Sequence, residues 1–299
     1  MSYVAHVLIY FEIYFVVALS LNLVVGYCGM LTLAHASYYA VGGYTYALLS
    51  AVLGWTFVPA LVAAVLVGSV LSLALSLPSW RLKGDFFVLG SLAVQAVLFG
   101  VFSNWSDGRA ALGSWRNLTN GPNGISNIPK PELFGRTLTE PVQFIWLASA
   151  VAVLVALIVW RLTSSPWARV LVAMRDDELA ARSVGKNTRL AKVQVLAISI
   201  ALVAIAGATY AAYVGYIDPS AASLDESILM LSMVLVGGAG NFRGPAVGAF
   251  TLVLIPELLR FLRLPNAQVG SLRLAIYGLL LVIIVHFRPQ GLCGRYRLK

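Results

Sequence analysis

Residues 174–185 read M-R-D-D-E-L-A-A-R-S-V-G, a short charged stretch that lies between two long hydrophobic runs. Its residue types favour a helix, and it closes on Gly185, a residue that commonly ends helices in a left-handed cap. Its flanks are basic, with Arg161, Arg169, Lys186, Arg189 and Lys192. By the positive-inside rule, these residues place the stretch on the cytoplasmic side of a membrane. The sequence therefore predicts a cytoplasmic helix within a membrane protein.

The composition supports a membrane-embedded chain. Of the 299 residues, 60% are hydrophobic and 11% are charged, whereas soluble domains are about 25% charged. The net charge of +9 gives no reason to expect nucleic acid, because the basic residues cluster in loops and at the C-terminus as membrane topology requires. Two cysteines, Cys28 and Cys293, form no disulfide framework. The first hydrophobic run lacks a basic n-region and a cleavage site, so we expect a retained helix.

Hydrophobic segments follow one another along the whole chain, each compared with the span of about 20 residues that a bilayer requires. They cover residues 4–25, 31–53, 57–80, 86–103, 142–162, 193–215, 226–240, 244–262 and 271–288. We therefore expect an all-α integral membrane protein, with eight or nine transmembrane helices in a single domain over residues 1–299.

The loops predict the orientation of these helices. Arg81 and Lys83, the loop 163–192 and the tail with Arg295, Arg297 and Lys299 are basic and belong on the cytoplasmic side. The loop that carries Asp218, Asp225 and Glu226 contains no Lys or Arg and belongs outside, as does the long loop 104–141. We expect the N-terminus outside and the C-terminus in the cytoplasm.

Glycine residues interrupt the hydrophobic runs in two regions. The first region holds Gly26, Gly29, Gly42 and Gly43, and the second holds Gly237, Gly238, Gly240 and Gly244. Irregular backbone at membrane depth is tolerated where it is buried in protein or lines a cavity, and paired broken segments point to a substrate path. Close helix packing through small residues is the alternative. Taken together, the two regions favour a translocation pathway.

Several polar side chains lie inside hydrophobic runs, where such groups usually face protein or water. Glu12 is expected to be buried, either hydrogen-bonded or at a subunit interface. His35 is more typical of a helix–helix hydrogen bond than of a proton relay. Asn22, Thr32 and Gln95 either satisfy backbone groups or bind the polar groups of a zwitterion, and we include them with His35 in the predicted pathway.

Blocks of sequence resemble the permeases of branched-chain amino acid ABC importers. They are L-N-L-V-V-G-Y-C-G-M-L-T-L-A-H-A (21–36), L-K-G-D-F-F-V-L-G-S-L-A (82–93), T-N-G-P-N-G-I (119–125), R-D-D-E-L-A-A-R-S-V-G (175–185), A-I-A-G-A-T-Y-A (204–211), V-L-V-G-G-A-G-N-F-R-G-P-A-V-G-A (234–249), P-E-L-L-R (256–260) and F-R-P-Q-G-L (287–292). They occur in the order of that family and cover nearly the whole chain. T-N-G-P-N-G-I and the tail favour the LivM-type subunit over the LivH-type.

The resemblance implies an ABC importer permease fold in a bacterial inner membrane. Such a subunit pairs with a second homologous permease, usually a different one, and docks two ABC ATPases and a periplasmic solute-binding protein. The chain has no G-x-x-x-x-G-K-[ST] phosphate loop, so we expect ATP and Mg on the ATPase partners and no cofactor here. No catalytic or metal-ligand cluster stands out, and an enzyme is a poor fit.

In that family the charged stretch would be the ATPase-coupling loop. The residues matched to it are Arg175, Asp176, Asp177, Glu178, Ala180, Ala181 and Gly185. ATPase closure would enter through this loop and rock the helices as a rigid body. The alternative is that the stretch is a solvent-exposed, charge-balanced loop that only connects two helices.

The substrate is less certain than the fold, because the chain departs from the family pattern in the expected pore. Met30 lies where the family commonly has Gln, and Thr32-Leu33-Ala34 lie where it commonly has Ser-Leu-Gly. Arg243 lies where family members often have an aromatic or small residue. We expect branched-chain or related amino acids. The alternatives are urea, short amides or other small organic solutes, and a secondary transporter fits less well.

The outer loop 104–141 is rich in the Asn, Gly and Pro of turns and is too long for a plain connection. We expect Asn120, Gly121, Pro122, Asn123 and Gly124 to contact the substrate-loaded binding protein. An ordered surface cap without a partner is the alternative.

Overall fold

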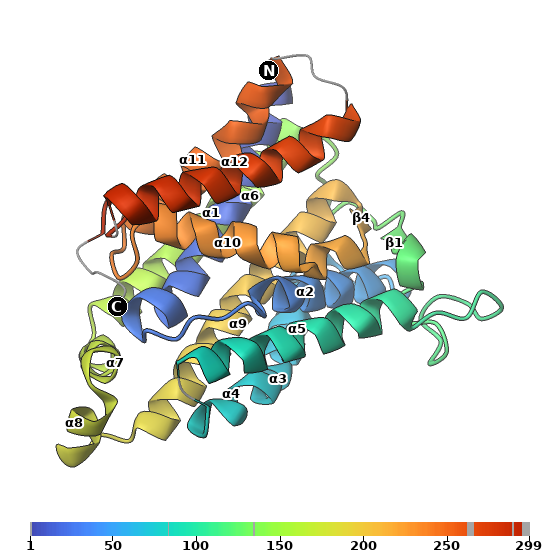
Figure 1. Cartoon of the computed structure of the whole chain (residues 1–299). Coiled ribbons are helices and arrows are strands. Elements are labelled where there is room, and N and C mark those ends of the chain that lie inside the picture. The colour runs from blue at the N-terminus through green and yellow to red at the C-terminus, as the bar shows by residue number, and fades with distance from the viewer. Residues whose placement is uncertain (1, 83, 134, 262–265, 289, 295–299) are drawn as a thin grey trace.

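The computed structural model describes residues 2–82, 84–133, 135–261, 266–288 and 290–294 (Figure 1). The described chain is a bundle of helices with two short antiparallel sheets. The tail residues Arg295, Arg297 and Lys299, and the loop residue Lys83, lie outside the described residues.

Within the residues that the structure describes, five segments are long and apolar enough to cross a membrane. They are Tyr3–Tyr27, Phe57–Trp80, Asp85–Asn104, Pro141–Thr163 and Thr188–Val214. The helices that form them are α1 (Ser2–Asn22), extended by the π-helix η1 (Leu23–Tyr27); α3 (Phe57–Leu71), followed by α4 (Leu73–Ser76) and η2 (Pro78–Trp80); α5 (Asp85–Asn104); α6 (Pro141–Thr163); and α9 (Thr188–Val214). The chain is thus a membrane-embedded, polytopic all-α protein, as predicted.

The other hydrophobic runs also form helices, and these are shorter or end near undescribed residues. They are α2 (His35–Ala51), α10 (Leu224–Gly237), α11 (Gly244–Phe261) and α12 (Asn266–Phe287). Every predicted hydrophobic run therefore contains a helix in the part of the chain that the structure describes. The helix α12 packs on α10 and α11 at the side of the bundle (Figure 1).

The centre of the bundle is formed by α2 and α9, which pack together more extensively than any other pair of elements described. In the most apolar 18-residue stretch of α9, 72% of the residues are buried. In the corresponding stretch of α5, which lies at the periphery, 22% are buried. Small residues allow this approach: a Cβ on Gly42 would overlap the Ala204 backbone, and one on Gly207 would overlap the Tyr39 carbonyl.

This packing corrects one prediction from the sequence. Gly42 and Gly43 were expected to break the second hydrophobic run, but both lie inside the continuous helix α2. A Cβ on Gly43 would lie 3.0 Å from Ile217 Cδ1 and 3.2 Å from the Gly207 carbonyl oxygen. These two glycines therefore provide close helix packing, the alternative that sequence reasoning had left open.

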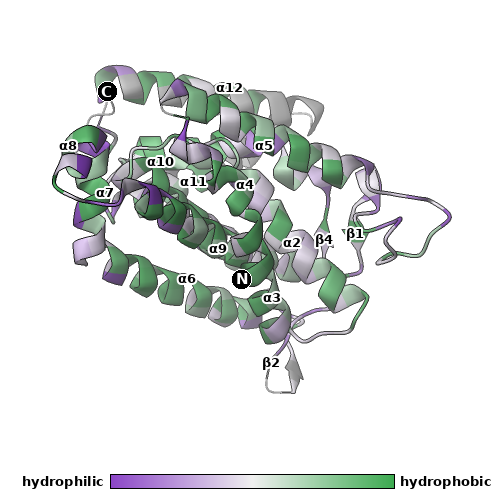
Figure 2. Ribbon diagram, turned by 90° about the horizontal axis from the view of Figure 1, so that it is seen from below, coloured by the Kyte–Doolittle hydropathy of each residue, from purple (hydrophilic) through white to green (hydrophobic). Residues whose placement is uncertain are grey.

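Polar residues concentrate at two opposite ends of the bundle. One end carries α7 (Pro166–Asp176) and α8 (Glu178–Ser183), and Figure 2 shows hydrophilic residues there against largely hydrophobic helices. The other end carries η3 (Gly121–Asn123), η4 (Pro219–Ala222), and β1 (Ile125–Ser126) paired with β4 (Tyr216–Ile217). The hairpin of β2 (Glu132–Leu133) and β3 (Arg136–Thr137) belongs to the same loop, 104–141.

The first and last described segments of the chain lie at opposite ends of the bundle. Near the start of α1, His6 Nδ1 lies 2.7 Å from the hydroxyl of Tyr213, at the end that carries β4. Near the C-terminus, Leu292 donates its N–H to the Val236 carbonyl at 2.9 Å, toward the end that carries α7.

Candidate functional site

The charged stretch forms the end of α7 and the whole of α8, where one helix was expected. Asp177 separates the two and caps α8, because its Oδ1 accepts hydrogen bonds from the N–H groups of Leu179 at 2.8 Å and Ala180 at 3.0 Å. Asp176 is the last residue of α7, so it does not lie at the start of the second helix.

Gly185 ends α8 in the left-handed conformation that the sequence predicted. Its φ is +80°, and its N–H donates to the Arg182 carbonyl at 2.8 Å. The N–H of Lys186 donates to the Ala181 carbonyl at 3.1 Å. This pair of bonds is a Schellman motif, which turns the chain back toward α9.

Glu178 points into the protein, toward the first turns of α9. Its Oε1 lies 2.6 Å from Arg182 Nη2 and 3.2 Å from the Thr188 hydroxyl, and its Oε2 lies 3.0 Å from Lys192 Nζ. Burial alone would raise the pKa of Glu178, but the hydrogen bond and charge of Lys192, with Arg182 and Thr188, lower it. Glu178 is therefore an ionised anchor that fastens α8 to α9.

Large apolar side chains are exposed on α8 and at its C-cap, beside the exposed Ser183. Leu179 is 67% exposed and Val184 is 77% exposed, and Ala180 is exposed beside them. Ala181, on the opposite face, is buried. Of the predicted coupling residues, Glu178 and Ala181 face inward and Ala180 faces outward, while the large exposed side chains, Leu179 and Val184, were not in the predicted set.

At the same end of the bundle, the two glycine-broken regions meet. Asn22, the last residue of α1, accepts the N–H of Gly240 at 2.9 Å and donates its amide to the Asn241 carbonyl at 3.0 Å. A Cβ on Gly26 would overlap both Asn22 Oδ1 and the Gly240 backbone. We call this contact of Asn22, Gly26, Gly240 and Asn241 the glycine junction.

The second glycine region turns tightly between α10 and α11. Gly237 ends α10 and Gly244 begins α11, and a Cβ on either would overlap backbone atoms across the turn. Gly238 has a φ of +109° and packs against the backbone of Gly294. Here the sequence prediction of a break is confirmed.

Arg175 joins the charged loop to the glycine junction. Its Nη1 donates to the Gly26 carbonyl at 2.7 Å, and its Nε lies 3.2 Å from Asp176 Oδ1. Its side chain passes directly over Gly29. Sequence analysis placed Arg175 with the coupling loop and Gly26 and Gly29 with the pathway, and the structure brings the two groups together.

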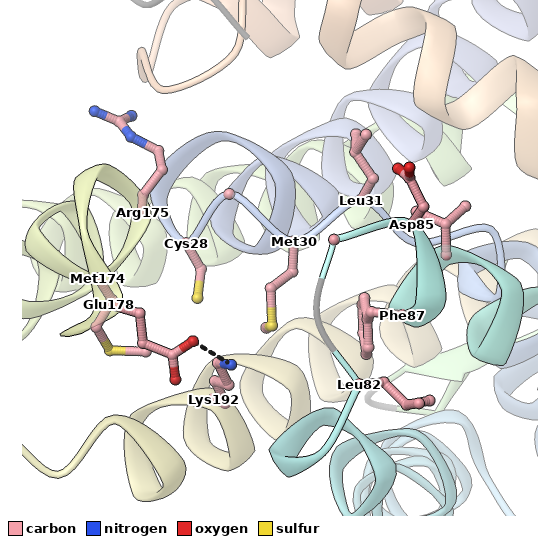
Figure 3. Close-up of a pocket in the computed structure, with 13 residues that line it drawn as sticks. Cys28, Met30, Leu31, Leu82, Asp85, Phe87, Met174, Arg175, Glu178 and Lys192 are labelled. Atoms are coloured by element: carbon pink, nitrogen blue, oxygen red, sulfur yellow. Dashed lines mark hydrogen bonds and ion pairs between the residues drawn. The ribbon is translucent and has the colours of Figure 1, made fainter. Parts of the chain in front are cut away.

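A cavity of about 240 Å³ lies between the end of α1, the start of α5, α7–α8 and α9 (Figure 3). Charged and apolar side chains line it, among them Cys28, Met30, Asp85, Phe87, Met174, Glu178 and Lys192. In Figure 3 the Glu178–Lys192 ion pair lies on one side of the cavity, and the guanidinium of Arg175 points away from that pair. The cavity is bordered by two of the predicted groups, the coupling loop and the broken end of α1.

The remaining predicted pathway residues lie apart from the junction. Their side chains mainly form hydrogen bonds with backbone groups or with a neighbouring helix. His35 Nε2 lies 2.8 Å from Ser20 Oγ, which confirms a helix–helix hydrogen bond. Thr32 Oγ1 accepts the Ala34 N–H at 3.2 Å, and Gln95 donates to the Ala222 carbonyl at 2.8 Å. Glu12 is buried and accepts a hydrogen bond from Ser149 of α6. The structure does not gather these side chains into one site.

The predicted binding-protein element is an ordered turn at the opposite end. Asn120, with a φ of +59°, donates its amide to the Gly124 carbonyl at 2.8 Å. Gly121 and Gly124 are buried, and a Cβ on Gly124 would overlap the Ile217 carbonyl. Pro122 and Asn123 are exposed, so they alone present side chains outward.

Sequence reasoning missed two contributors to these contacts. The sequence indicates Lys192 only as a flanking positive charge, whereas in the structure it is buried and its Nζ lies 3.0 Å from Glu178 Oε2. Asn241 donates its amide to the Cys293 carbonyl at 2.7 Å and fixes the chain near its C-terminus. The signal for Asn241 was its place inside V-L-V-G-G-A-G-N-F-R-G, among glycines that need a hydrogen-bonding neighbour.

Comparison with known families gives the class of the protein. A family described as the permease component of branched-chain amino acid transport systems matches residues 3–285. The chain belongs to this family. The permease is accordingly a transport component of the membrane and not an enzyme.

Individual relatives agree with this assignment. The permease is 33% identical to the high-affinity branched-chain amino acid transport system permease protein LivM of Escherichia coli (strain K12), over 94% of this chain and 67% of that protein. It is 28% identical to the probable LivM protein of Methanocaldococcus jannaschii, over 97% of this chain and 92% of that protein. The autoinducer 2 import system permease LsrC of Salmonella typhimurium is 24% identical over 60% of this chain and 48% of its own length. No solved structure matches significantly.

Proposed function

We propose that this permease is one of two membrane subunits of an ATP-driven importer for branched-chain or related amino acids. The observation that carries the proposal is the match of nearly the whole chain to branched-chain amino acid permeases, including relatives named LivM. The relatives named for autoinducer 2 import support the second candidate, a permease of the same family for a different small organic solute. A secondary transporter is the least favoured.

The proposed ATPase contact is the outward face of α8. Leu179 and Val184 are large apolar side chains exposed at the tip of a polar loop, where no lipid is expected to cover them. Exposed apolar groups rimmed by polar residues are typical of protein contacts. Asp177, Glu178 and Gly185 fix the direction in which this face points. ATP and Mg would bind to the ATPase partners.

The other proposed partners belong to the remaining surfaces. A periplasmic binding protein would contact Pro122 and Asn123, the exposed residues of the outer turn. A second, homologous permease would complete the pathway within the bilayer. With α7–α8 in the cytoplasm, the start of α1 would lie outside and the C-terminus inside, in a bacterial inner membrane.

The test is purification of the tagged permease from its native membranes in mild detergent, with mass spectrometry of the co-purifying proteins. We expect the wild-type permease to co-purify with a second permease and a P-loop ATPase. The Leu179→Asp variant should no longer co-purify with the ATPase. Trp115→Asp adds the same charge at another exposed apolar residue, on the outer loop, so it serves as the matched control. Recovery of the permease alone, with transport in proteoliposomes that contain no ATPase, would contradict the proposal.

A further inference from the structure

The end of α1 leaves backbone carbonyls that have no partner within the helix, as every helix C-terminus does. The helix widens into the π-helix Leu23–Tyr27, where the Cys28 N–H donates to the Leu23 carbonyl at 3.3 Å and the Met30 N–H to the Val24 carbonyl at 3.1 Å. The chain then leaves helical conformation until His35. The Gly26 carbonyl is reached instead by Arg175, at 2.7 Å.

Arg175 fits this position closely. Its side chain is only 11% exposed and lies in a slot between two glycines. A Cβ on Gly29 would come within 2.6 Å of Arg175 Cγ, and a Cβ on Gly240 within 3.0 Å of Nη1. Any side chain at either glycine would therefore push the guanidinium away from the Gly26 carbonyl.

The interaction is also favourable on electrostatic grounds. A cation near a helix C-terminus interacts well with the helix dipole, and a charged donor makes a stronger hydrogen bond than a neutral one. The guanidinium offers several fixed donors, so it can hold Gly26 and Asp176 at once.

The contact continues into the other half of the chain. Gly26 packs on Gly240, and Asn22, one turn earlier, holds the Gly240 N–H and the Asn241 carbonyl. A continuous series of bonds thus runs from α7 through Arg175 and the end of α1 to the α10–α11 connection.

We infer that Arg175 is a positioning residue that transmits movement of the α7–α8 loop to the glycine junction, through its bond to the Gly26 carbonyl. This rests on the proposed function, in which the ATPases move that loop. Spatial continuity alone does not demonstrate coupling between two sites, so the test measures the coupling directly.

The experiment compares Arg175→Met, Arg175→Lys and Arg169→Met in the reconstituted complex with its own ATPases and binding protein. Arg169 is an exposed arginine of the same helix and provides the matched control. Two quantities are measured for each complex: solute imported per ATP hydrolysed, and the change in amide hydrogen exchange of residues 23–31 between nucleotide-free and vanadate-trapped states.

We expect Arg175→Met to assemble and hydrolyse ATP, while import per ATP falls roughly tenfold, within the range of about 5–150-fold that coupling energies typically produce. The state-dependent change in exchange at residues 23–31 should disappear. Arg175→Lys should recover part of both, and Arg169→Met should match wild type.

Three results would overturn the inference: an unchanged import-to-ATP ratio in Arg175→Met, retention of the state-dependent exchange change, or an equal effect of Arg169→Met. If Arg175→Met fails to assemble, Arg175→Lys and Gly29→Ala provide the comparison, since Gly29→Ala displaces the same guanidinium. Failure of the proposed function looks different, because the wild-type permease would then recover no ATPase.

Discussion

The side chain of Asn22 joins the first third of the chain to its last third, through a hydrogen bond of 2.9 Å from the Gly240 N–H to Asn22 Oδ1. The same amide donates to the Asn241 carbonyl at 3.0 Å. Asn22 is fully buried, so no water replaces these bonds if the side chain is removed. One polar residue therefore fixes how α1 meets the α10–α11 connection.

Replacing Asn22 should consequently destabilise the permease. Asn22→Leu keeps the approximate shape but leaves the Gly240 N–H buried without its acceptor, which costs about 1–3 kcal/mol. We expect the apparent melting temperature of the purified protein in detergent to fall by a few degrees. Asn104→Leu is the control, because Asn104 is exposed and its side-chain amide donates to the Gly100 carbonyl of its own helix. Equal melting temperatures for Asn22→Leu and wild type would show that the junction is held by other contacts.

A double-mutant cycle should rank the two cations that hold Glu178. Arg182 makes the shorter contact, 2.6 Å, but its side chain is 35% exposed, whereas that of Lys192 is 8% exposed. Exposed ion pairs contribute little because solvent screens them, and losing one partner of a buried pair costs more. We expect a larger coupling energy for Glu178→Gln with Lys192→Met than for Glu178→Gln with Arg182→Met. Melting temperatures of the single and double variants give both values, and the reverse order would contradict this account.

The anchoring of α8 should depend on pH through Glu178. Because the folded state lowers the pKa of Glu178, the ionised form stabilises the loop fully above its usual pKa of about 4.3. That contribution is lost as the pH falls through the lower folded value. A nitroxide label at position 179, in a variant with Cys28 and Cys293 replaced, should stay immobilised at neutral pH and become mobile only in acid, below the usual glutamate pKa of about 4.3. In Glu178→Gln the label should be mobile throughout, and a transition near neutral pH would rule out this carboxylate as the cause.

Packing between α2 and α9 predicts a contrast between two glycines. Gly42→Ala places a methyl group against the Ala204 backbone, and overpacking of this kind typically costs about 1–3 kcal/mol. Gly100→Ala, within α5, meets no atom within 4 Å and gains helix propensity of up to about 1 kcal/mol. We expect Gly42→Ala to lower the melting temperature and Gly100→Ala to leave it unchanged or raise it. Similar stability of the two variants would mean that the helices separate easily.

In the outer turn, substitutions at exposed and at hydrogen-bonded residues should have different effects. Asn123→Arg changes an exposed side chain and should weaken stimulation of ATP hydrolysis by the binding protein without lowering thermal stability. Asn120→Ala removes the bond to the Gly124 carbonyl and should lower stability as well. Deletion of residues 120–124 would change stability and binding-protein contact together, so it could not separate the two effects. Full stimulation in Asn123→Arg would favour an ordered cap without a partner.

The sequence by itself determined the helical membrane class, because hydrophobic runs long enough to cross a bilayer leave few other structures possible. It also determined where α8 ends, since Gly185 acts on backbone groups a few residues away. These features depend on local chemistry and on composition, which a chain displays before it folds.

Only the tertiary structure decided which residues act together. Gly26 and Gly42 look alike in sequence, yet Gly26 lies at a broken helix end beside Gly240, and Gly42 lies inside a helix against Ala204. The sequence groups Glu178 only with the other residues of the charged stretch, and the fold pairs it with Lys192 of α9. The contact of Arg175 with Gly26 joins residues 149 positions apart. Such contacts depend on how distant helices pack, and no local pattern specifies that.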